Sequence, residues 1–251
     1  MQHGLNLGAR PMLVAVSEEG VASPLVRDVL AALDPNVPQL HTTDAVFETI
    51  SDTVTNQGIV AAFPLNSSSA LLPRLEPDAA LVLVLDRVAD PGNVGALLRS
   101  GAAAGCDAIL LAPGCADPYN PKTVRSSGGG VFGAPVASLS WAEIEAYIAD
   151  LPQRYAARGQ ALQTCYEADL AGGCAILVGN EAEGLGPAAL ALATQEVGIP
   201  ITTAVESLNV AAAGAVLLFE ARRQRAVRDS NVHNNTRPTN RRPPTAGSER
   251  A

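Results

Sequence analysis

The chain has 251 residues, of which 47% are hydrophobic and only 4% aromatic, so its core must be built mainly from alanine, valine and leucine. This length suffices for one large domain or two modest ones. The sequence has no run of about 18 apolar residues and no basic-then-apolar secretory signal, so we expect a cytoplasmic protein without membrane contact.

The net charge of −8 is unevenly distributed along the chain. Residues 221–251 carry eight arginines against Asp229 and Glu249, a local balance of +6, which leaves −14 on the remainder. A basic tail on an acidic body is typical of chains that contact nucleic acid. A solvated tail without any partner explains the charge equally well.

The four cysteines, at positions 106, 115, 165 and 174, form no C-x-x-C pair, and no histidine lies near them. We therefore expect small buried side chains and no metal site.

The first predicted elements form a small α/β unit over residues 1–64. Residues 12–16 are a short apolar strand, and a helix face recurs from Pro24 to Leu33. A second apolar stretch at 58–63 follows a polar turn. Residues 65–79, rich in proline and serine, predict a linker.

Residues 80–226 are predicted to form a second domain in which apolar strands alternate with helices. Strands are expected at 81–86, 108–112 and 175–179, with a shorter one at 197–201. Continuous apolar runs separated by helices indicate parallel strands that are buried on both faces.

The last predicted helix runs from Leu208 to Arg223 and is apolar along AAAGAVLLF. It should therefore be buried, against this chain or a partner. The composition of residues 227–251 predicts a disordered basic tail.

Polar stretches follow the predicted strands, at the edge where open α/β sheets bind ligands. In the first stretch, Asn93 is expected to begin a helix, and Arg99 lies nearly two turns further on, toward the same face. An arginine in an apolar helix needs an anionic or carbonyl partner. A structural salt bridge explains Arg99 as well as a functional role does.

Three further stretches have weaker local signals. Glycines at 128–130 follow Lys122 and Arg125, which permits a phosphate-binding loop, although an ordinary turn is favoured. The chain has neither G-x-x-x-x-G-K-[ST] nor G-x-G-x-x-G, which argues against nucleotide-dependent kinases and oxidoreductases. The other two stretches supply Glu181 after a strand, and Ser207 or Asn209 as an N-cap.

Taken together and in this order, these stretches resemble the SpoU family of RNA 2′-O-ribose methyltransferases in the SPOUT superfamily. The three motifs appear as DPGNVGALLR, as LVGNEAEGLG, and as IP followed by ESLNVAAAGAVLLFE, between about Leu81 and Gln224. Residues 1–64 are similar to the latter portion of an L30e-like substrate-binding domain. The opening strand and helix of that domain are not recognisable before Met12.

The resemblance implies an α/β catalytic domain with a parallel sheet, flanking helices and a deep trefoil knot. It implies a homodimer with the active site near the subunit interface, S-adenosylmethionine as cofactor, and RNA rather than DNA as partner. Arg99 matches the family's catalytic arginine. The residues implied to hold Arg99 are Asn93, Glu181, Ser207 and Asn209. The residues implied to hold the cofactor through main-chain groups are Gly179, Ile199 and Leu208.

A guanidinium stays protonated at neutral pH, so we favour a role for Arg99 in positioning an RNA phosphate over a role as the base. The L30e-like unit favours 23S ribosomal RNA as substrate. A tRNA methyltransferase of the same family and a non-catalytic knotted RNA-binding protein are the alternatives, and a resistance role stays open beside a housekeeping one.

Overall fold

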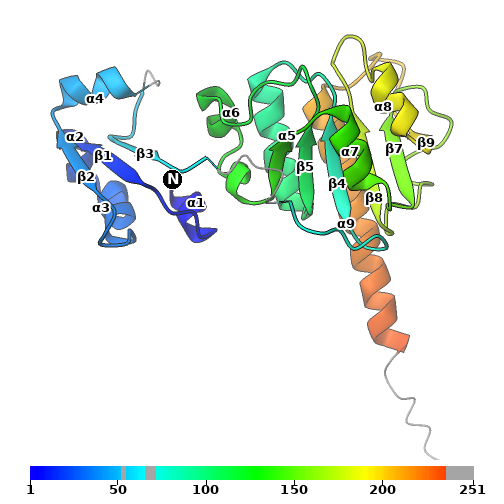
Figure 1. The fold of residues 1–251 in the computed structure, drawn as a ribbon, viewed down its shortest axis with the longest axis horizontal. Coiled ribbons are helices and arrows are strands. Elements are labelled where there is room, and N and C mark those ends of the chain that lie inside the picture. The colour runs from blue at the N-terminus through cyan, green and yellow to red at the C-terminus, as the bar shows by residue number, and fades with distance from the viewer. Residues whose placement is uncertain (52–54, 66–71, 236–251) are drawn as a thin grey trace, which may run out of the picture.

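The computed structural model describes residues 1–51, 55–65 and 72–235, with side chains placed up to residue 230. A small three-stranded unit lies beside a larger six-stranded domain, and the last helix extends away from that domain (Figure 1). The α/β class predicted from the sequence is confirmed. Parts of the expected linker (66–71) and of the expected tail (236–251) lie outside the described residues.

The small unit contains a three-stranded sheet with the order β2-β1-β3, in which β1 pairs parallel with β2 and antiparallel with β3. Val14 and Val16 of β1 are fully buried, as is Phe47 from the facing helix. The elements are α1 (Gln2–Asn6), β1 (Leu13–Ser17), α2 (Glu18–Ala22), α3 (Pro24–Ala31), β2 (Gln39–Thr42), α4 (Asp44–Ile50) and β3 (Ile59–Ala62).

Two segments of the first 64 residues contact the larger domain. Gly4 of α1 is buried against the ring of Phe132, where an added Cβ would lie 2.9 Å from the nearest ring carbon. Phe63, just after β3, stacks on the same ring at a tilt, with ring centroids 4.8 Å apart. Phe132 is therefore contacted by the segments that enter and leave the small sheet.

The larger domain contains a six-stranded, all-parallel sheet with the order β6-β5-β4-β8-β7-β9. The elements are β4 (Leu81–Leu85), α5 (Pro91–Ala104), β5 (Ala108–Leu111), α6 (Pro121–Ser126), the 3-10 turn η2 (Gly130–Phe132), β6 (Val136–Ser138), α7 (Trp141–Ile148), β7 (Gln153–Ala157), β8 (Cys174–Val178), α8 (Pro187–Leu192), β9 (Gln195–Val197) and α9 (Val210–Asn235).

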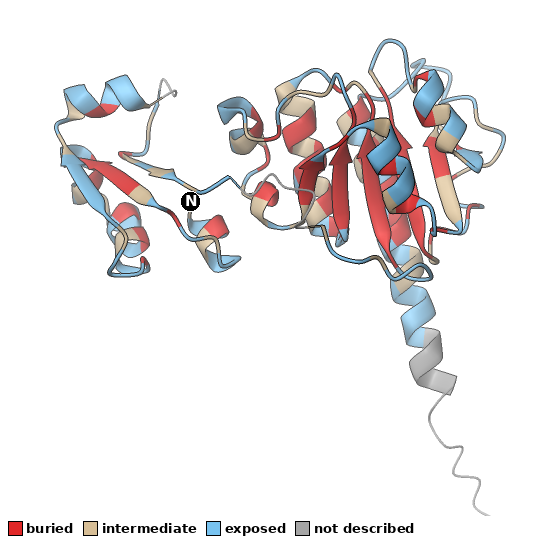
Figure 2. Ribbon diagram, viewed as in Figure 1, coloured by how far each residue is buried: buried red, intermediate tan, exposed pale blue. Residues whose placement is uncertain are grey.

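The three strongest predicted strands are β4, β5 and β8 at the centre of the sheet, and every residue in them is buried (Figure 2). The fourth expected strand, at 197–201, is wrong in its position: β9 ends at Val197. The sequence did not predict β6 or β7. Strand β7 reads QRYAA, and only two of its residues are buried, so it lacks the long apolar run that marked the central strands.

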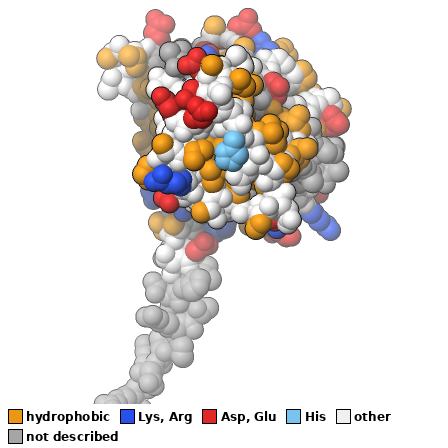
Figure 3. Space-filling view, turned by 90° about the vertical axis from the view of Figure 1, so that its left-hand side faces the viewer, with side chains coloured by type: hydrophobic (Ala, Val, Ile, Leu, Met, Phe, Trp, Pro, Cys, Tyr) orange, Lys and Arg blue, Asp and Glu red, His pale blue; other side chains and the backbone are white. Residues whose placement is uncertain are grey.

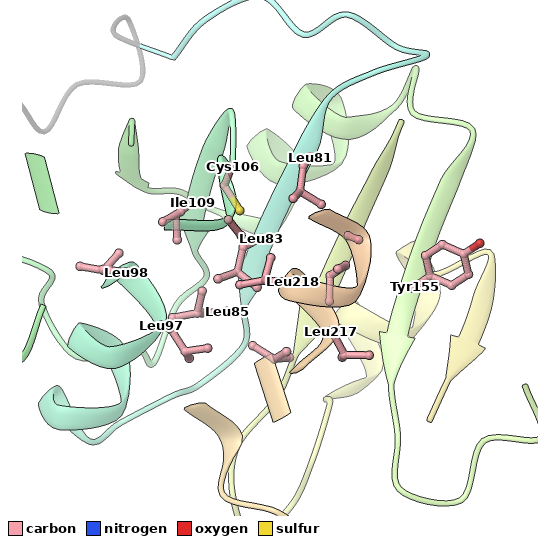
Figure 4. Close-up of a cluster of buried hydrophobic side chains, with 14 of the residues drawn as sticks. Leu81, Leu83, Leu85, Leu97, Leu98, Cys106, Ile109, Tyr155, Leu217 and Leu218 are labelled. Atoms are coloured by element: carbon pink, nitrogen blue, oxygen red, sulfur yellow. The ribbon is translucent and has the colours of Figure 1, made fainter. Parts of the chain in front are cut away.

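Side chains of β4 alternate between two apolar layers. Leu81, Leu83 and Leu85 pack toward α5 and α9, where they meet Leu97 and Leu218 (Figure 4). Val82 and Val84 belong to the opposite layer, beneath α7 and α8. Burial on both faces explains why these strands read as uninterrupted apolar runs.

Two helix ends differ from expectation. Helix α5 begins at Pro91, because Asp90 accepts a hydrogen bond from the Asn93 main chain (3.0 Å), so Asn93 is not its start. Helix α9 continues to Asn235, so residues 227–235 are helical and not disordered. Arg225 anchors this helix by donating to the Leu170 and Gly172 carbonyls.

Despite its 26 residues α9 is not apolar enough to cross a membrane, and no other helix of the described chain is a candidate.

Helix α5 offers a test of this packing. A Cβ on Gly95 would lie 2.5 Å from the Thr123 carbonyl oxygen, whereas a Cβ on Gly101 would meet the flexible end of Ile109 at 2.7 Å. We expect Gly95→Ala to lower the free energy of unfolding by about 1–3 kcal/mol, because the backbone of α6 would have to move. The matched Gly101→Ala should cost less, since Ile109 can rotate away. Urea unfolding of both variants measures the difference; equal effects would contradict it.

Candidate active site

A pocket of about 170 Å³ opens at the carboxyl ends of β7, β8 and β9 and is bordered by the beginning of α9. This is the sheet edge where ligands bind in parallel α/β folds. Gly179, Ile199 and Leu208, the three expected cofactor contacts, all line it. Its walls combine glycines, which expose main-chain groups, with the apolar side chains of Val197, Ile199, Ile201, Leu208, Val210 and Leu217.

Next to this pocket the side chain of Asn93 joins residues from all three motifs. Its amide nitrogen donates to the Glu181 carboxylate, and its amide oxygen accepts from Nδ2 of Asn209 at 3.1 Å. The three residues are up to 116 positions apart in the sequence. Three of the residues expected at the site are thus in direct contact. We call these three residues the Asn93 junction.

The two asparagines of the junction lie at the starts of helices, Asn93 in the first turn of α5 and Asn209 just before α9. Asp90, the cap of α5, also lies 3.2 Å from the ammonium of Lys122. The Asn93 main-chain donor, followed by Lys122, lowers the pKa of the Asp90 carboxyl. Asn209 accepts from the main chain of Ala211 at 2.9 Å and of Ala212 at 3.3 Å, so it caps α9. One side chain thus both caps α9 and reaches Asn93.

Glu181 lies in a tight turn that depends on the glycines at its two ends, Gly179 and Gly184. Asn180 and Gly184 exchange main-chain hydrogen bonds across it, and Gly184 has a φ of +68°. A Cβ on Gly179 would lie 2.3 Å from the Gly184 carbonyl carbon, so glycine is required at that close approach. The turn places Glu181 at the mouth of the pocket.

Arg99 is exposed and takes no part in the hydrogen bonds of the junction. Its guanidinium lies against Gly128, where a Cβ would be 3.4 Å from Cζ, and its backbone approaches Gly130. Within residues 1–51, 55–65 and 72–230 it has no hydrogen-bond or ion-pair partner. Asn93, Glu181, Ser207 and Asn209 therefore form no hydrogen bond or ion pair with Arg99 within the described part of this single chain, and the expectation that they hold it stays a prediction. Six residues are about 1.7 helical turns, so Asn93 and Arg99 do not share a face.

Ser207 lines the pocket but does not cap α9, which settles the choice between it and Asn209 as the N-cap. Two further arginines near the pocket were not predicted from the sequence. Arg158 lines the pocket and pairs with Glu196 at 2.7 Å. Arg87 lies beneath the Glu181 turn and donates to the Gly184 carbonyl at 3.1 Å. Arg87 directly follows the strand expected at 81–86, which is the positional signal that could have found it, whereas Arg158 follows β7, which the sequence did not predict.

The cysteines offer no nucleophile at this site. Burial raises the pKa of the Cys115 thiol to about 11, so it stays neutral near pH 7. Cys106, Cys165 and Cys174 are buried, and all four thiols are free.

Comparison with known proteins places this geometry in context. Residues 80–219 match the model of the SpoU rRNA Methylase family. The chain is 37% identical over 204 residues to an uncharacterized tRNA/rRNA methyltransferase of Synechocystis, covering 80% of this chain and 73% of that one. It is 32% identical over 218 residues to the 23S rRNA (guanosine(2553)-2'-O)-methyltransferase RlmP of Bacillus subtilis, covering 82% and 84%.

A solved structure shares the fold over most of both chains. The SpoU methyltransferase AviRb from Streptomyces viridochromogenes, in complex with the cofactor AdoMet, aligns with a TM-score of 0.77 at 26% identity. The alignment covers 90% of this chain and 87% of AviRb.

The cap of α9 can be tested by stability alone. We expect Asn209→Ala to lower the free energy of unfolding by about 1 kcal/mol, because two main-chain donors lose their acceptor. Asn209→Ser should retain most of this stability, since serine is also a good cap. Ser207→Ala serves as the control and should leave the urea midpoint unchanged. A larger loss for Ser207→Ala than for Asn209→Ala would reverse the assignment of the cap.

Proposed function

Because the chain belongs to the SpoU rRNA methylase family, we propose that it methylates a ribose 2′-hydroxyl of 23S ribosomal RNA, using S-adenosylmethionine. The observation that carries this proposal is the Asn93 junction, which brings three separate motifs together beside the pocket. Its intact polar side chains argue against a non-catalytic RNA-binding protein. We propose that the reaction takes place in the cytoplasm.

The pocket fits the adenosine part of the cofactor. Apolar side chains such as Val197 and Leu217 offer flat surfaces to a heteroaromatic ring, and the main chain at Gly179, Ile199 and Leu208 offers donors and acceptors for its polar edge. When bound, S-adenosylmethionine supplies an electrophilic methyl group on a sulfonium centre. Glu181 and Ser207 line this pocket and are the polar side chains that we expect to face the ribose.

In this proposal Arg99 contacts a phosphate of the RNA and not a carboxylate of the protein. Its guanidinium is exposed and stays charged at neutral pH, which suits bidentate contact with a phosphate. The 2′-hydroxyl must lose its proton as its oxygen attacks the methyl carbon. A guanidinium is already protonated and cannot accept that proton, so the part of Arg99 is to hold the RNA backbone in line, and the proton passes to solvent with the assistance of a phosphate oxygen.

Phosphate contacts belong mainly to the larger domain. Arg125 is exposed on α6, close in sequence to the glycines that support Arg99. The small unit, residues 1–64, carries seven acidic residues against two arginines, and acidic side chains gather on the face seen in Figure 3. Such a surface gains little from phosphate neutralisation. Its part as the substrate-binding unit then rests on shape and on exposed apolar side chains such as Leu40 and Val46.

A homodimer through α9 completes the proposal. Val216 and Phe219 are exposed on this helix at 38% and 48%, on the side opposite the buried Leu217 and Leu218. A second copy of the chain would cover this apolar surface. The trefoil knot expected from the family stays a prediction.

We expect Arg99→Ala to abolish methyl transfer to ribosomal RNA while leaving cofactor affinity within about twofold, because Arg99 does not line the pocket. Labelled S-adenosylmethionine with 23S RNA or tRNA as acceptor measures transfer, and calorimetry measures affinity. Arg99→Lys, which keeps the charge but not the planar guanidinium with its paired N–H donors, should restore only part of the activity. An equal loss of cofactor binding would make Arg99 structural. Label on tRNA alone would identify tRNA as the substrate, and no label with any RNA from the wild type would contradict the enzyme.

We expect Phe219→Glu to convert the dimer to a monomer, because a carboxylate in an apolar interface lacks a partner. Sedimentation velocity measures the change. Leu162→Glu is the matched control, since Leu162 is fully exposed on another surface. A monomeric wild type would refute the dimer, and so would a Phe219→Glu variant that stays dimeric.

A further inference from the structure

Arg87 follows β4 and connects the end of that strand to the pocket turn at residues 180–184. Its guanidinium donates to the Asp86 carboxylate at 3.3 Å, to the Gly184 carbonyl at 3.1 Å and to the Glu183 carboxylate. Its own carbonyl accepts from Nδ2 of Asn180 at 3.1 Å. Arg87 and the turn at 180–184 are therefore joined in both directions: the Arg87 side chain donates to the turn, and the turn donates to the Arg87 main chain.

The network is anchored in the protein interior by Asp86. This carboxylate is only 2% exposed, and it also accepts from the Gly186 main chain at 2.6 Å. A buried carboxylate requires such donors, so neither contact can be lost without cost. The Glu183 pair is different, because its carboxylate is 70% exposed and solvent screens the interaction. The main-chain and Asp86 contacts therefore dominate.

Arg87 also has an uncommon backbone conformation. Its φ is +55°, and it is the sole non-glycine residue with a positive φ among residues 1–51, 55–65 and 72–235. A left-handed conformation costs about 1 kcal/mol or more for a residue with a Cβ. Its side chain passes closely over Gly114, where an added Cβ would lie 3.0 Å from Arg87 Cγ. An arginine in this strained position indicates that the guanidinium contacts outweigh the strain.

The turn that Arg87 holds forms one side of the pocket. Gly179, Asn180, Glu181 and Gly184 line the pocket, whereas Arg87 does not. We propose that Arg87 is a positioning residue, which fixes the 179–184 turn in its binding-competent shape before the cofactor arrives. A turn ordered in advance saves the free energy that binding would otherwise spend on ordering it. This inference rests on the proposed function, because it assumes that S-adenosylmethionine occupies the pocket.

The test compares two arginine-to-methionine variants that each remove several hydrogen bonds. Arg87→Met should raise the Kd for S-adenosylmethionine about tenfold, measured by calorimetry without RNA. Arg225→Met is the control, since Arg225 donates to the carbonyls of Ala80, Leu170 and Gly172, outside the pocket. It should lower the Tm while leaving the Kd within about twofold. A parallel rise in Kd for both variants would reduce Arg87 to general fold stability and overturn the proposal.

Three further substitutions separate the guanidinium from the turn geometry. Arg87→Gly relieves the strain but removes the donors, so it should still weaken binding; wild-type affinity would show that conformation alone sets the turn and overturn the proposal. Arg87→Lys should recover only part of the affinity, because an ammonium cannot reproduce the planar fork. Glu183→Gln should change the Kd less than threefold, as its exposure implies.

The turnover rate supplies a readout that distinguishes this inference from the proposed function. At saturating cofactor, Arg87→Met should retain kcat within about threefold while its KM for S-adenosylmethionine rises with the Kd. A wild type that does not bind the cofactor would refute the proposed function itself. A wild type that binds, with an Arg87→Met variant that binds equally well, would refute only the role of Arg87.

Discussion

The site depends on one amide, the side chain of Asn93, which is shared between a carboxylate and a second amide. It can satisfy Glu181 and Asn209 together because a primary amide carries both donors and an acceptor. Aspartate in its place would offer no donor to Glu181, and an apolar residue would offer neither contact. The start of α5, the turn after β8 and the start of α9 therefore keep a fixed arrangement at this point.

The parallel sheet makes this meeting possible. Central strands β4 and β8 are adjacent and buried on both faces, so their carboxyl ends lie at one edge with little freedom. The turns that follow them can then carry polar groups at fixed positions. Asp86 and Arg87 after β4 meet Gly184 and Gly186 after β8, and the pocket forms beside this contact. A rigid apolar layer thus supports a polar edge.

The arginines around the pocket and Arg99 form two groups that differ in their pairing with carboxylates. Around the pocket, cations are paired: Arg87 with Asp86 and Glu183, and Arg158 with Glu196. Arg99, on the other side of α5, has no such pairing within the described part of the chain. A paired arginine organises the protein, whereas an exposed arginine without a protein partner has donors available for a phosphate. This division explains how an acidic chain can still act on RNA.

The sequence by itself determined the central strands, the two-unit organisation of the expected elements and the identity of the junction residues. Those features are recorded in local apolar runs and in short motifs such as DPGNVGALLR. Only the tertiary structure decided that Asn93 contacts Glu181 and Asn209 while Arg99 points elsewhere, that Asp90 begins α5, that α9 reaches Asn235, and that Arg87 holds the pocket turn. The physical reason is range: hydrophobic periodicity acts between near neighbours, whereas the contacts of Asn93 and Arg87 join residues about a hundred positions apart, and their geometry follows from how the helices pack on the sheet.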